Sequence, residues 1–303
     1  MQTELECMSC FMKQALATAR ICSDDPELHR LIVCETGKLL AEFDLKLSPP
    51  ENAVALYQQI AELSGIPDPF FDLKKESNDL AVSLRKDVRD RIRCADDPLY
   101  AAVRYAIAGN IIDYGAQHEF DAIQTLSRCL EDDLCIDDYG TLKDDVKGTI
   151  GKKILYLADN CGEIVFDTLL IEQLQNHGHS VTLVVRGKEI LNDVTMREAH
   201  AVGIDTACSI ITNGTSCPGT PLGSSSEELK QAFAGADLII SKGQGNFETL
   251  SDVEGPLYFL LTVKCPVVAN HITCLQNISA GKLQGHGEMV LMKREEQDAY
   301  DSD

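Results

Sequence analysis

The segment KKILYLADNCGEIVFD, residues 152–167, decides the fold. Within it the apolar run Ile154–Ala158 follows a basic pair, as is typical of a buried parallel strand. Gly162 permits a tight turn, and Glu163 and Asp167 fall near the start of the following helix, where carboxylates suit the helix dipole. This order predicts one strand–turn–helix unit of an α/β protein, with polar side chains at the carboxyl end of the strand.

Strands and helices alternate through the second half of the chain. Strands are predicted at 154–158, 180–185, 208–212, 237–241 and 266–270. Helices are predicted at 163–176, 189–200, 227–234 and, in part, 257–263. Such alternation implies a parallel, doubly wound sheet with right-handed crossovers, so the predicted fold class is α/β.

The first half of the chain has the helical spacing of apolar residues and no convincing strand. Helices are predicted at 10–21, 29–43, 52–64, 72–94 and 99–114. The predicted organisation is therefore a helical N-terminal domain at 1–148, an α/β domain at 149–290 and a charged C-terminal tail at 291–303.

Composition and charge narrow the function classes. The 303 residues carry a net charge of −21, which disfavours non-specific binding to nucleic acid or to an anionic membrane. An anionic substrate remains compatible, because a divalent cation and a few lysines can invert the field locally. There is no apolar run of about 20 residues and no signal-peptide pattern, and the 12 cysteines are scattered. We therefore expect a cytoplasmic protein with reduced thiols and with neither a nucleic-acid nor a membrane partner.

Hard oxygen donors follow the first two predicted strands of the sheet. Asp159 and Asn160 come directly after the first strand, and Asp193 lies in the segment after the second. Two carboxylates and an amide, completed by water and phosphate oxygens, suit Mg²⁺ or Mn²⁺ better than zinc. The alternative is that all three side chains only cap helices, and spacing alone does not decide between these interpretations.

A second polar segment, Lys242–Asn246, follows the fourth predicted strand. In the common strand order the first and fourth strands are neighbours, so Asp159 and Lys242 would face each other at the switch point of the sheet. The glycines and the lysine suit a phosphate cradle. The segment is neither a dinucleotide fingerprint nor a P-loop, and an ordinary strand-to-helix turn is the alternative. Lys264, before the fifth predicted strand, is on composition alone a solvated lysine.

The cysteines are weaker candidates for a metal site, a redox site or a catalytic nucleophile. The pair Cys7 and Cys10 lacks a second ligand pair for zinc and a preceding strand for a thioredoxin-type role. Cys161 sits at a predicted helix start, which lowers a thiol pKa, but a cysteine hydrolase also needs a positioned base. The nearby histidines, His177 and His179, lie at the far end of that helix, so we expect Cys161 to be a bystander.

Four ordered motifs resemble the damage-control phosphatases, formerly domain-of-unknown-function family 89. They are DNCGE at 159–163, LNDVT at 191–195, SKGQGNFE at 241–248 and VKCPV at 263–267. Three further segments resemble the prokaryotic branch of that family, which has an N-terminal Cys-x-x-Cys. They are CMSC at 7–10, DPLY at 97–100 and AGNIID at 108–113.

The resemblance implies a three-layer α/β/α sandwich with an N-terminal helical region, and a metal-dependent phosphatase of small phosphorylated metabolites. It implies that Asp159, Asn160 and Asp193 hold a divalent Mn, Co, Ni or Mg ion, with Asp159 or Asp193 orienting the attacking water. The residues that it assigns to the phosphate pocket or the same cleft are Lys242, Gly243, Gln244, Gly245, Asn246, Lys264, Asn110 and Asp113. Glu163 and Arg186 are further candidates. Other branches carry Arg-Thr-x-Lys where this chain has Leu-Thr-Val-Lys264, which weakens the assignment of Lys264.

Two other functions compete with the phosphatase. An adenosylmethionine-dependent carboxyl methyltransferase would need a glycine-rich first loop and an acidic residue after the second strand, where this chain has Asp-Asn-Cys-Gly and Arg186. A non-catalytic metal- or metabolite-binding protein would use the same residues without turnover. The sequence indicates no particular substrate and no oligomeric state.

Overall fold

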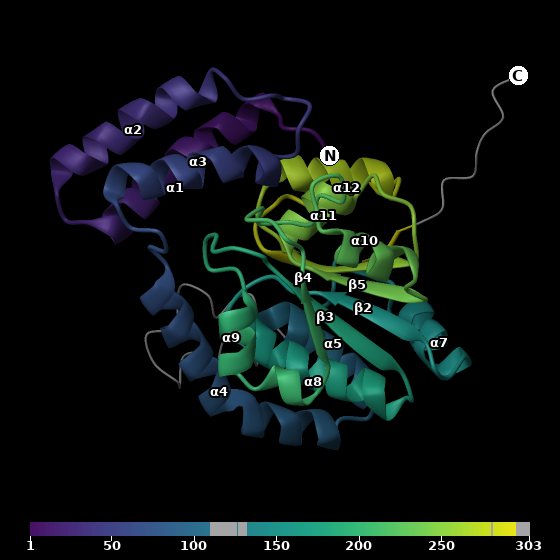
Figure 1. Ribbon diagram of the computed structural model, residues 1–303. Helices are drawn as coiled ribbons and strands as arrows, with labels where there is room; N and C mark the ends of the chain where they lie inside the picture. The colour runs from purple at the N-terminus through teal and green to yellow at the C-terminus, as the bar shows by residue number, and fades with distance from the viewer. Residues whose placement is uncertain (110–125, 127–131, 280, 295–303) are drawn as a thin grey trace, which may run out of the picture.

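The computed structural model describes residues 1–109, 126, 132–279 and 281–294. Within these residues a seven-stranded sheet has the order β1-β7-β6-β5-β2-β3-β4 (Figure 1). The strands are β1 Ile136–Asp137, β2 Lys153–Leu157, β3 Ser180–Val185, β4 Ser209–Thr212, β5 Leu238–Lys242, β6 Leu257–Val263 and β7 Glu288–Lys293. The block from β6 to β4 is parallel, and β7 runs antiparallel to β6. The predicted, mainly parallel, doubly wound sheet is confirmed, including the pairing of the first and fourth predicted strands as β2 and β5.

Helices cover both faces of the sheet, and three more form an N-terminal layer. Their bounds are α1 Leu5–Cys22, α2 Pro26–Leu40, α3 Pro49–Ser64, α4 Phe71–Cys94, α5 Pro98–Ala108, α7 Tyr139–Gly148, α8 Glu163–Asn176, α9 Met196–Ala201, α10 Glu227–Ala234, α11 Gln244–Leu250 and α12 Pro266–Leu275. Local signals explain several ends. Ser48 and Glu51 form a capping box at the start of α3, and Gly65, at φ +71°, ends that helix.

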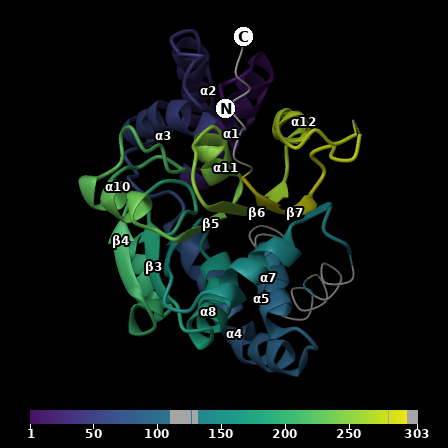
Figure 2. The same cartoon turned by 90° about the vertical axis from the view of Figure 1, so that its right-hand side faces the viewer.

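The alternation of side chains along the strands creates two apolar cores. Tyr156 of β2 and Ile240 of β5 face α4, α5 and α8, whereas Leu157 and Phe259 face α10, α11 and α12. Figure 2 shows these two helical layers on opposite sides of the sheet. The strands are buried on both faces, which is why their sequences are nearly continuous apolar runs.

The helices α1, α2 and α3 pack around a third core that includes Phe11, Leu56 and Ile60. In Figure 1 this layer lies beyond α11, to one side of the sheet. Ile190, from the segment that follows β3, is buried in the same core. The N-terminal layer therefore packs directly on a loop that leaves the carboxyl end of the sheet.

Three predicted elements were wrong. Residues 257–263 form strand β6, not a helix, and 266–275 form helix α12, not a strand. A short apolar run does not separate a buried strand from a buried helix by period, and Pro266 occupies the first turn of α12, where proline is favourable. The predicted helix 189–200 begins only at Met196, because the preceding residues form a loop that pairs with the loop after β2.

The edge of the sheet also departs from prediction. Strand β1 lies within the region expected to be wholly helical, and it pairs with β7. Strand β7 extends to Lys293, beyond the predicted start of the tail. None of the helices in the described residues is both long enough and apolar enough to span a membrane.

Candidate active site

Two loops at the carboxyl end of the sheet are joined through their backbones. The Val194 N–H donates to the Asp159 carbonyl at 2.9 Å, and the Cys161 N–H donates to the Asn192 carbonyl at 2.9 Å. Between these bonds the backbones of Asn160 and Asp193 form an antiparallel bridge. The loops after β2 and β3 therefore bring Asp159, Asn160 and Asp193 together, as the sequence predicted.

Arg186, the residue after β3, connects the two carboxylates. Its Nε donates to Asp193 Oδ2 at 2.6 Å, and a terminal nitrogen lies 3.4 Å from Asp159 Oδ1. The other terminal nitrogen donates to the Gly219 carbonyl and to Asn246 Oδ1, each at 3.0 Å. The Arg186 side chain is only 1% exposed, so this cation is part of the site's interior rather than a surface group.

The carboxylates of this group are held in an unfavourable electrostatic environment. Burial, followed by the negative charges of Asp193 and Glu163, raises the pKa of Asp159 well above its usual range, and Arg186 opposes this only in part. Burial also raises the pKa of Asp193 despite the guanidinium bonded to it. The site thus stabilises a positive charge placed beside these oxygens.

Gly243 follows β5 at φ +79° and lies against Asp159. A Cβ added to Gly243 would come within 1.9 Å of Asp159 Oδ2, so only glycine fits there. The Lys242–Asn246 segment therefore approaches the Asp159 loop through the Gly243 backbone. The prediction that Asp159 and Lys242 face each other is wrong, because the Lys242 side chain turns to Glu163 and Asp167.

Asn246 and Gly245, from the same segment, make close contacts with neighbouring parts of the fold. Asn246 is fully buried, and its amide donates to the Ala158 carbonyl at 3.0 Å and to the Lys242 carbonyl at 2.8 Å. Gly245 packs so closely on the Pro218 carbonyl that a Cβ would lie 1.9 Å from it. These contacts hold the ends of β2 and β5 and the loop after β4 in register.

Lys242 is also occupied within the fold. Its ammonium is fully buried and donates to the Ala106 carbonyl at 2.7 Å, to Asp167 Oδ1 at 2.8 Å and to Glu163. An ammonium has three N–H donors, and each has an acceptor here. The structure therefore assigns Lys242 to the support of α5 and α8 and not to the phosphate pocket that the sequence predicted.

The position of Lys264 in the fold differs from the prediction. Lys264 follows the carboxyl end of β6, not the start of a strand, so it lies at the same edge of the sheet as Asp159. Its ammonium lowers the pKa of both Asp159 and Glu163. Its backbone N–H donates to Gln244 Oε1 at 3.0 Å, and the Gln244 amide donates to Glu248 at 2.7 Å. Lys264 is thus an exposed cation directed towards the carboxylate site.

Sequence reasoning missed Asp167, Tyr156 and Glu248 as parts of this region. The Tyr156 hydroxyl donates to Asp167 Oδ1 at 2.6 Å, and burial raises the pKa of Glu248 to about 7. The spacing of Glu163 and Asp167 on one helix face was an available signal for the buried group. Asn110 and Asp113 lie outside the described residues.

Neither Cys161 nor Cys7 has the environment of a reactive thiol. Cys161 is fully buried, and its Sγ lies 3.8 Å from the Asp193 carbonyl. Burial raises the pKa of Cys7 to about 11, opposite to what a reactive thiol requires. In the part of the chain that is described, no three His, Cys, Asp or Glu side chains converge as a metal-binding group. The predicted ligand set differs from such a group, because its third member is an amide.

These features define a class: a doubly wound α/β protein with carboxylate, amide and basic side chains gathered at the switch point of its sheet. Residues 3–277 match the model of the damage-control phosphatase ARMT1-like domain, and the chain belongs to that family. This confirms the resemblance seen in the sequence. The assignment to a branch by its Cys-x-x-Cys stays a prediction.

Individual relatives agree with this assignment. The chain is 34% identical to a damage-control phosphatase of Archaeoglobus fulgidus, over 88% of this chain and 93% of that protein. It is 33% identical to one of Pyrococcus horikoshii, over 90% and 94% respectively. A crystal structure of a DUF89 family protein from Pyrococcus horikoshii superposes with a TM-score of 0.86 at 32% identity, covering 97% of this chain and 100% of that one.

Proposed function

We propose that this protein is a metal-dependent phosphatase that hydrolyses phosphate monoesters of small metabolites. The observation that carries the proposal is the convergence of Asp159, Asn160 and Asp193 from two loops that are bonded to each other. Family membership supports the reaction class, and the names of the archaeal relatives agree with it.

The donor set fits a divalent cation. Among the described residues, the buried carboxylates of Asp159, Asp193, Glu163 and Asp167 lie against two buried cations, Arg186 and Lys242, and the exposed Lys264 acts on Asp159 and Glu163. If all are ionised, four negative charges meet three positive ones, and the excess of −1 favours a bound cation. Hard carboxylate and amide oxygens suit Mg²⁺ or Mn²⁺. Asp159, Asn160 and Asp193 would hold the ion, which would supply Lewis-acid polarisation of the phosphate.

The protein's own side chains would perform the other roles in hydrolysis. Lys264 neutralises negative charge on the phosphate oxygens during transfer. Asp159 or Asp193 orients water for in-line attack and accepts its proton. The new bond joins the water oxygen to phosphorus as the ester bond breaks, and the departing oxygen takes up a proton returned by that carboxyl group or by solvent, which gives the alcohol and inorganic phosphate. Arg186 holds the two carboxylates in place, because its guanidinium bonds Asp193 and Asp159 and is itself anchored to the Gly219 carbonyl, Thr220 and Asn246.

The test is phosphate release from a panel of metabolite phosphates with Mn²⁺, Co²⁺, Ni²⁺, Mg²⁺ or EDTA. We expect metal-stimulated release that is abolished in Asp159→Ala and retained in Asp79→Ala, a control at an exposed position of α4. Release by Asp159→Ala at the wild-type rate, or no metal-stimulated release from any substrate, would overturn the proposal. Circular dichroism of both variants separates loss of chemistry from loss of fold.

A further inference from the structure

Helix α4 contacts both loops that carry the carboxylate site. Near the start of this helix Lys74 is 1% exposed and donates to Glu189, in the loop that follows β3. One turn later Asn78 accepts a hydrogen bond from Gly162, in the loop that follows β2. Residues four apart lie on the same face of a helix, so one face of α4 reaches both loops.

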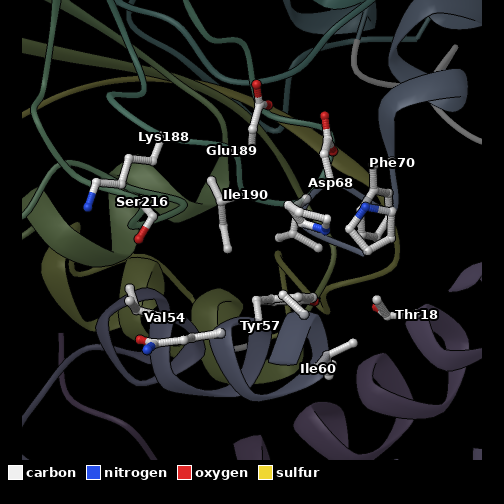
Figure 3. A pocket seen from close by; sticks show the side chains of 15 residues that line it. Thr18, Val54, Tyr57, Ile60, Asp68, Phe70, Lys188, Glu189, Ile190 and Ser216 are labelled. Atoms are coloured by element: carbon white, nitrogen blue, oxygen red, sulfur yellow. The ribbon is translucent and has the colours of Figure 1, made fainter. Parts of the chain in front are cut away.

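The contact with the loop after β3 is ionic. The Lys74 ammonium bonds Glu189 and lies 3.4 Å from Asp68. Figure 3, a close view of the pocket beside these groups, shows the carboxylates of Asp68 and Glu189 both pointing away from α3. The next residue, Ile190, accepts a hydrogen bond from the Asp193 N–H at 3.1 Å. The ionic group therefore fixes to α4 the loop that carries Asp193.

The contact with the loop after β2 is a neutral hydrogen bond. Asn78 is 6% exposed, and its Oδ1 accepts from the Gly162 N–H at 2.7 Å. Gly162 has φ +80° and ψ −59°, a conformation that residues with a side chain rarely adopt. A Cβ added there would lie 3.3 Å from Ser77 Cβ, so α4 covers this glycine closely. Backbone in such a conformation persists only where its surroundings hold it.

The position of Gly162 in the loop makes this bond relevant to the site. Gly162 lies two residues after Asn160, at the end of the loop that begins with Asp159. Backbone bonds align this loop with the one that carries Asp193. The Asn78 bond adds a fixed point on α4, where the loop turns into α8. The backbone that carries the first two oxygen donors is thus held from two sides, by the other loop and by α4.

We propose that Asn78 is a positioning residue of the metal site. By accepting the Gly162 N–H, it holds the backbone of Asp159 and Asn160 in register with Asp193. The inference rests on the proposed function, in which these three side chains hold a divalent ion. An apolar side chain of similar shape would leave the Gly162 N–H without this acceptor, and the loop would shift to pair it elsewhere. Groups that orient metal ligands typically account for about 10–100-fold in metal affinity.

The experiment measures Mn²⁺ affinity by calorimetry without substrate, at a temperature where circular dichroism shows each protein to be folded. Asn78→Leu removes the acceptor at nearly constant volume, whereas Asn78→Asp keeps an acceptor oxygen in the same place. Arg85→Leu is the matched control, because it removes a bond from the same helix to the Val202 carbonyl at the end of α9. We expect Asn78→Leu to bind Mn²⁺ about 10–100-fold more weakly than the wild type. We expect Asn78→Asp to bind at least as tightly as the wild type, and Arg85→Leu to stay within about twofold of it.

Hydrogen exchange at the Gly162 amide tests the contact itself. This amide should exchange at least about tenfold faster in Asn78→Leu than in the wild type or Arg85→Leu, and Asn78→Asp should keep it protected. Faster exchange with unchanged Mn²⁺ affinity would overturn the inference, because Asn78 would then only cap α8. Should Asn78→Leu fail to fold, Asn78→Ala takes its place, with the same expected order of affinities.

Three further results would contradict the role of Asn78. They are Mn²⁺ affinity in Asn78→Leu within about twofold of the wild type, equal losses in Asn78→Leu and Arg85→Leu, or a loss in Asn78→Asp as large as in Asn78→Leu. Phosphate release is a separate readout. If the affinities differ as expected but no metabolite phosphate is hydrolysed, the proposed function fails and the role of Asn78 stands. If phosphate is released but the affinities are equal, the proposed function stands and the role of Asn78 fails.

Discussion

Two buried ionic clusters lie side by side at the switch point, and each has one cation and two carboxylates. The Arg186 cluster contains Asp159 and Asp193, and the Lys242 cluster contains Glu163 and Asp167. The Lys242 ammonium is enclosed by α5 and α8, with an acceptor for each of its donors. The Arg186 cluster instead ends in two carboxylates at the carboxyl edge, where Lys264 acts on Asp159.

The comparison shows that two clusters with the same charges, one cation and two carboxylates, can have different roles. Each N–H donor of the Lys242 ammonium has an acceptor within the protein, so this lysine stabilises the packing of α5 and α8 on the sheet. Burial raises the pKa of the carboxylates in both clusters, so the clusters differ in position: the Arg186 cluster lies at the carboxyl edge of the sheet, where the exposed Lys264 acts on Asp159 and where a binding or catalytic site is expected. Substitutions in the two clusters should therefore have different effects, with loss of activity from the Arg186 cluster and loss of stability from the Lys242 cluster.

The largest effect is expected from the matched pair Asp193→Asn and Asp167→Asn. Asp193→Asn should lower kcat/KM by about 10³-fold or more, because it removes a proposed metal ligand. Asp167→Asn should leave kcat/KM within about tenfold, since that carboxylate faces Lys242 and Tyr156. Steady-state kinetics with saturating Mn²⁺ measure both. Equal losses in the two variants would contradict the division of roles.

Removing the cation of the closed cluster should affect folding more than chemistry. Lys242→Met leaves Glu163 and Asp167 buried without their counter-ion, which should lower the free energy of unfolding by about 3–5 kcal/mol. Urea unfolding measures the loss. The triple variant that adds Glu163→Gln and Asp167→Asn should recover part of it. A Lys242→Met protein of undiminished stability but without activity would restore the phosphate-binding role predicted from sequence.

Lys264→Ala should reduce kcat/KM on the order of 10²-fold with little change in stability, because the side chain is exposed and acts on the site through its charge. Lys230→Ala, at an exposed ion pair on α10, is the control and should retain full activity. An unchanged kcat/KM in Lys264→Ala would show that the cation next to Asp159 has no part in phosphate transfer.

The smallest effect is a pH-dependent one at Glu248. Its pKa is raised by burial to about 7 in the folded protein, from 4.5, so the charged form disfavours folding. The contribution of Glu248 to the free energy of unfolding is fully present below pH 4.5 and is lost as the pH rises through about 7. Glu248→Gln should therefore be more stable than the wild type at pH 8, by on the order of 1–3 kcal/mol, and no more stable at pH 4.5. Thermal unfolding at the two pH values measures the difference, and a stabilisation of equal size at both would contradict it.

Several elements could be predicted from local sequence because local forces produce them. Helix α8 and strand β3 begin and end where the sequence placed them, since a positive-φ glycine precedes α8 and an apolar run makes up β3. Strand β6 and helix α12 were interchanged, because both are short and apolar and their period does not separate a buried strand from a buried helix, although Pro266 favours a helix start. That error also placed Lys264 before a strand rather than after one.

The sequence by itself determined the doubly wound sheet and the approach of Asp159, Asn160 and Asp193, because polar residues after parallel strands must meet at one edge. Only the tertiary structure decided which of two lysines lies beside the carboxylate site: Lys242, which ends β5, or Lys264, which follows β6. Lys242 ends β5 two residues after Ile240, so the alternation of side chains turns it into the layer of α8, where Glu163 and Asp167 meet it. Lys264 lies one residue beyond β6, outside the core, and remains at the edge with Asp159. Which charges a lysine meets depends on packing between distant segments, and sequence spacing does not contain that information.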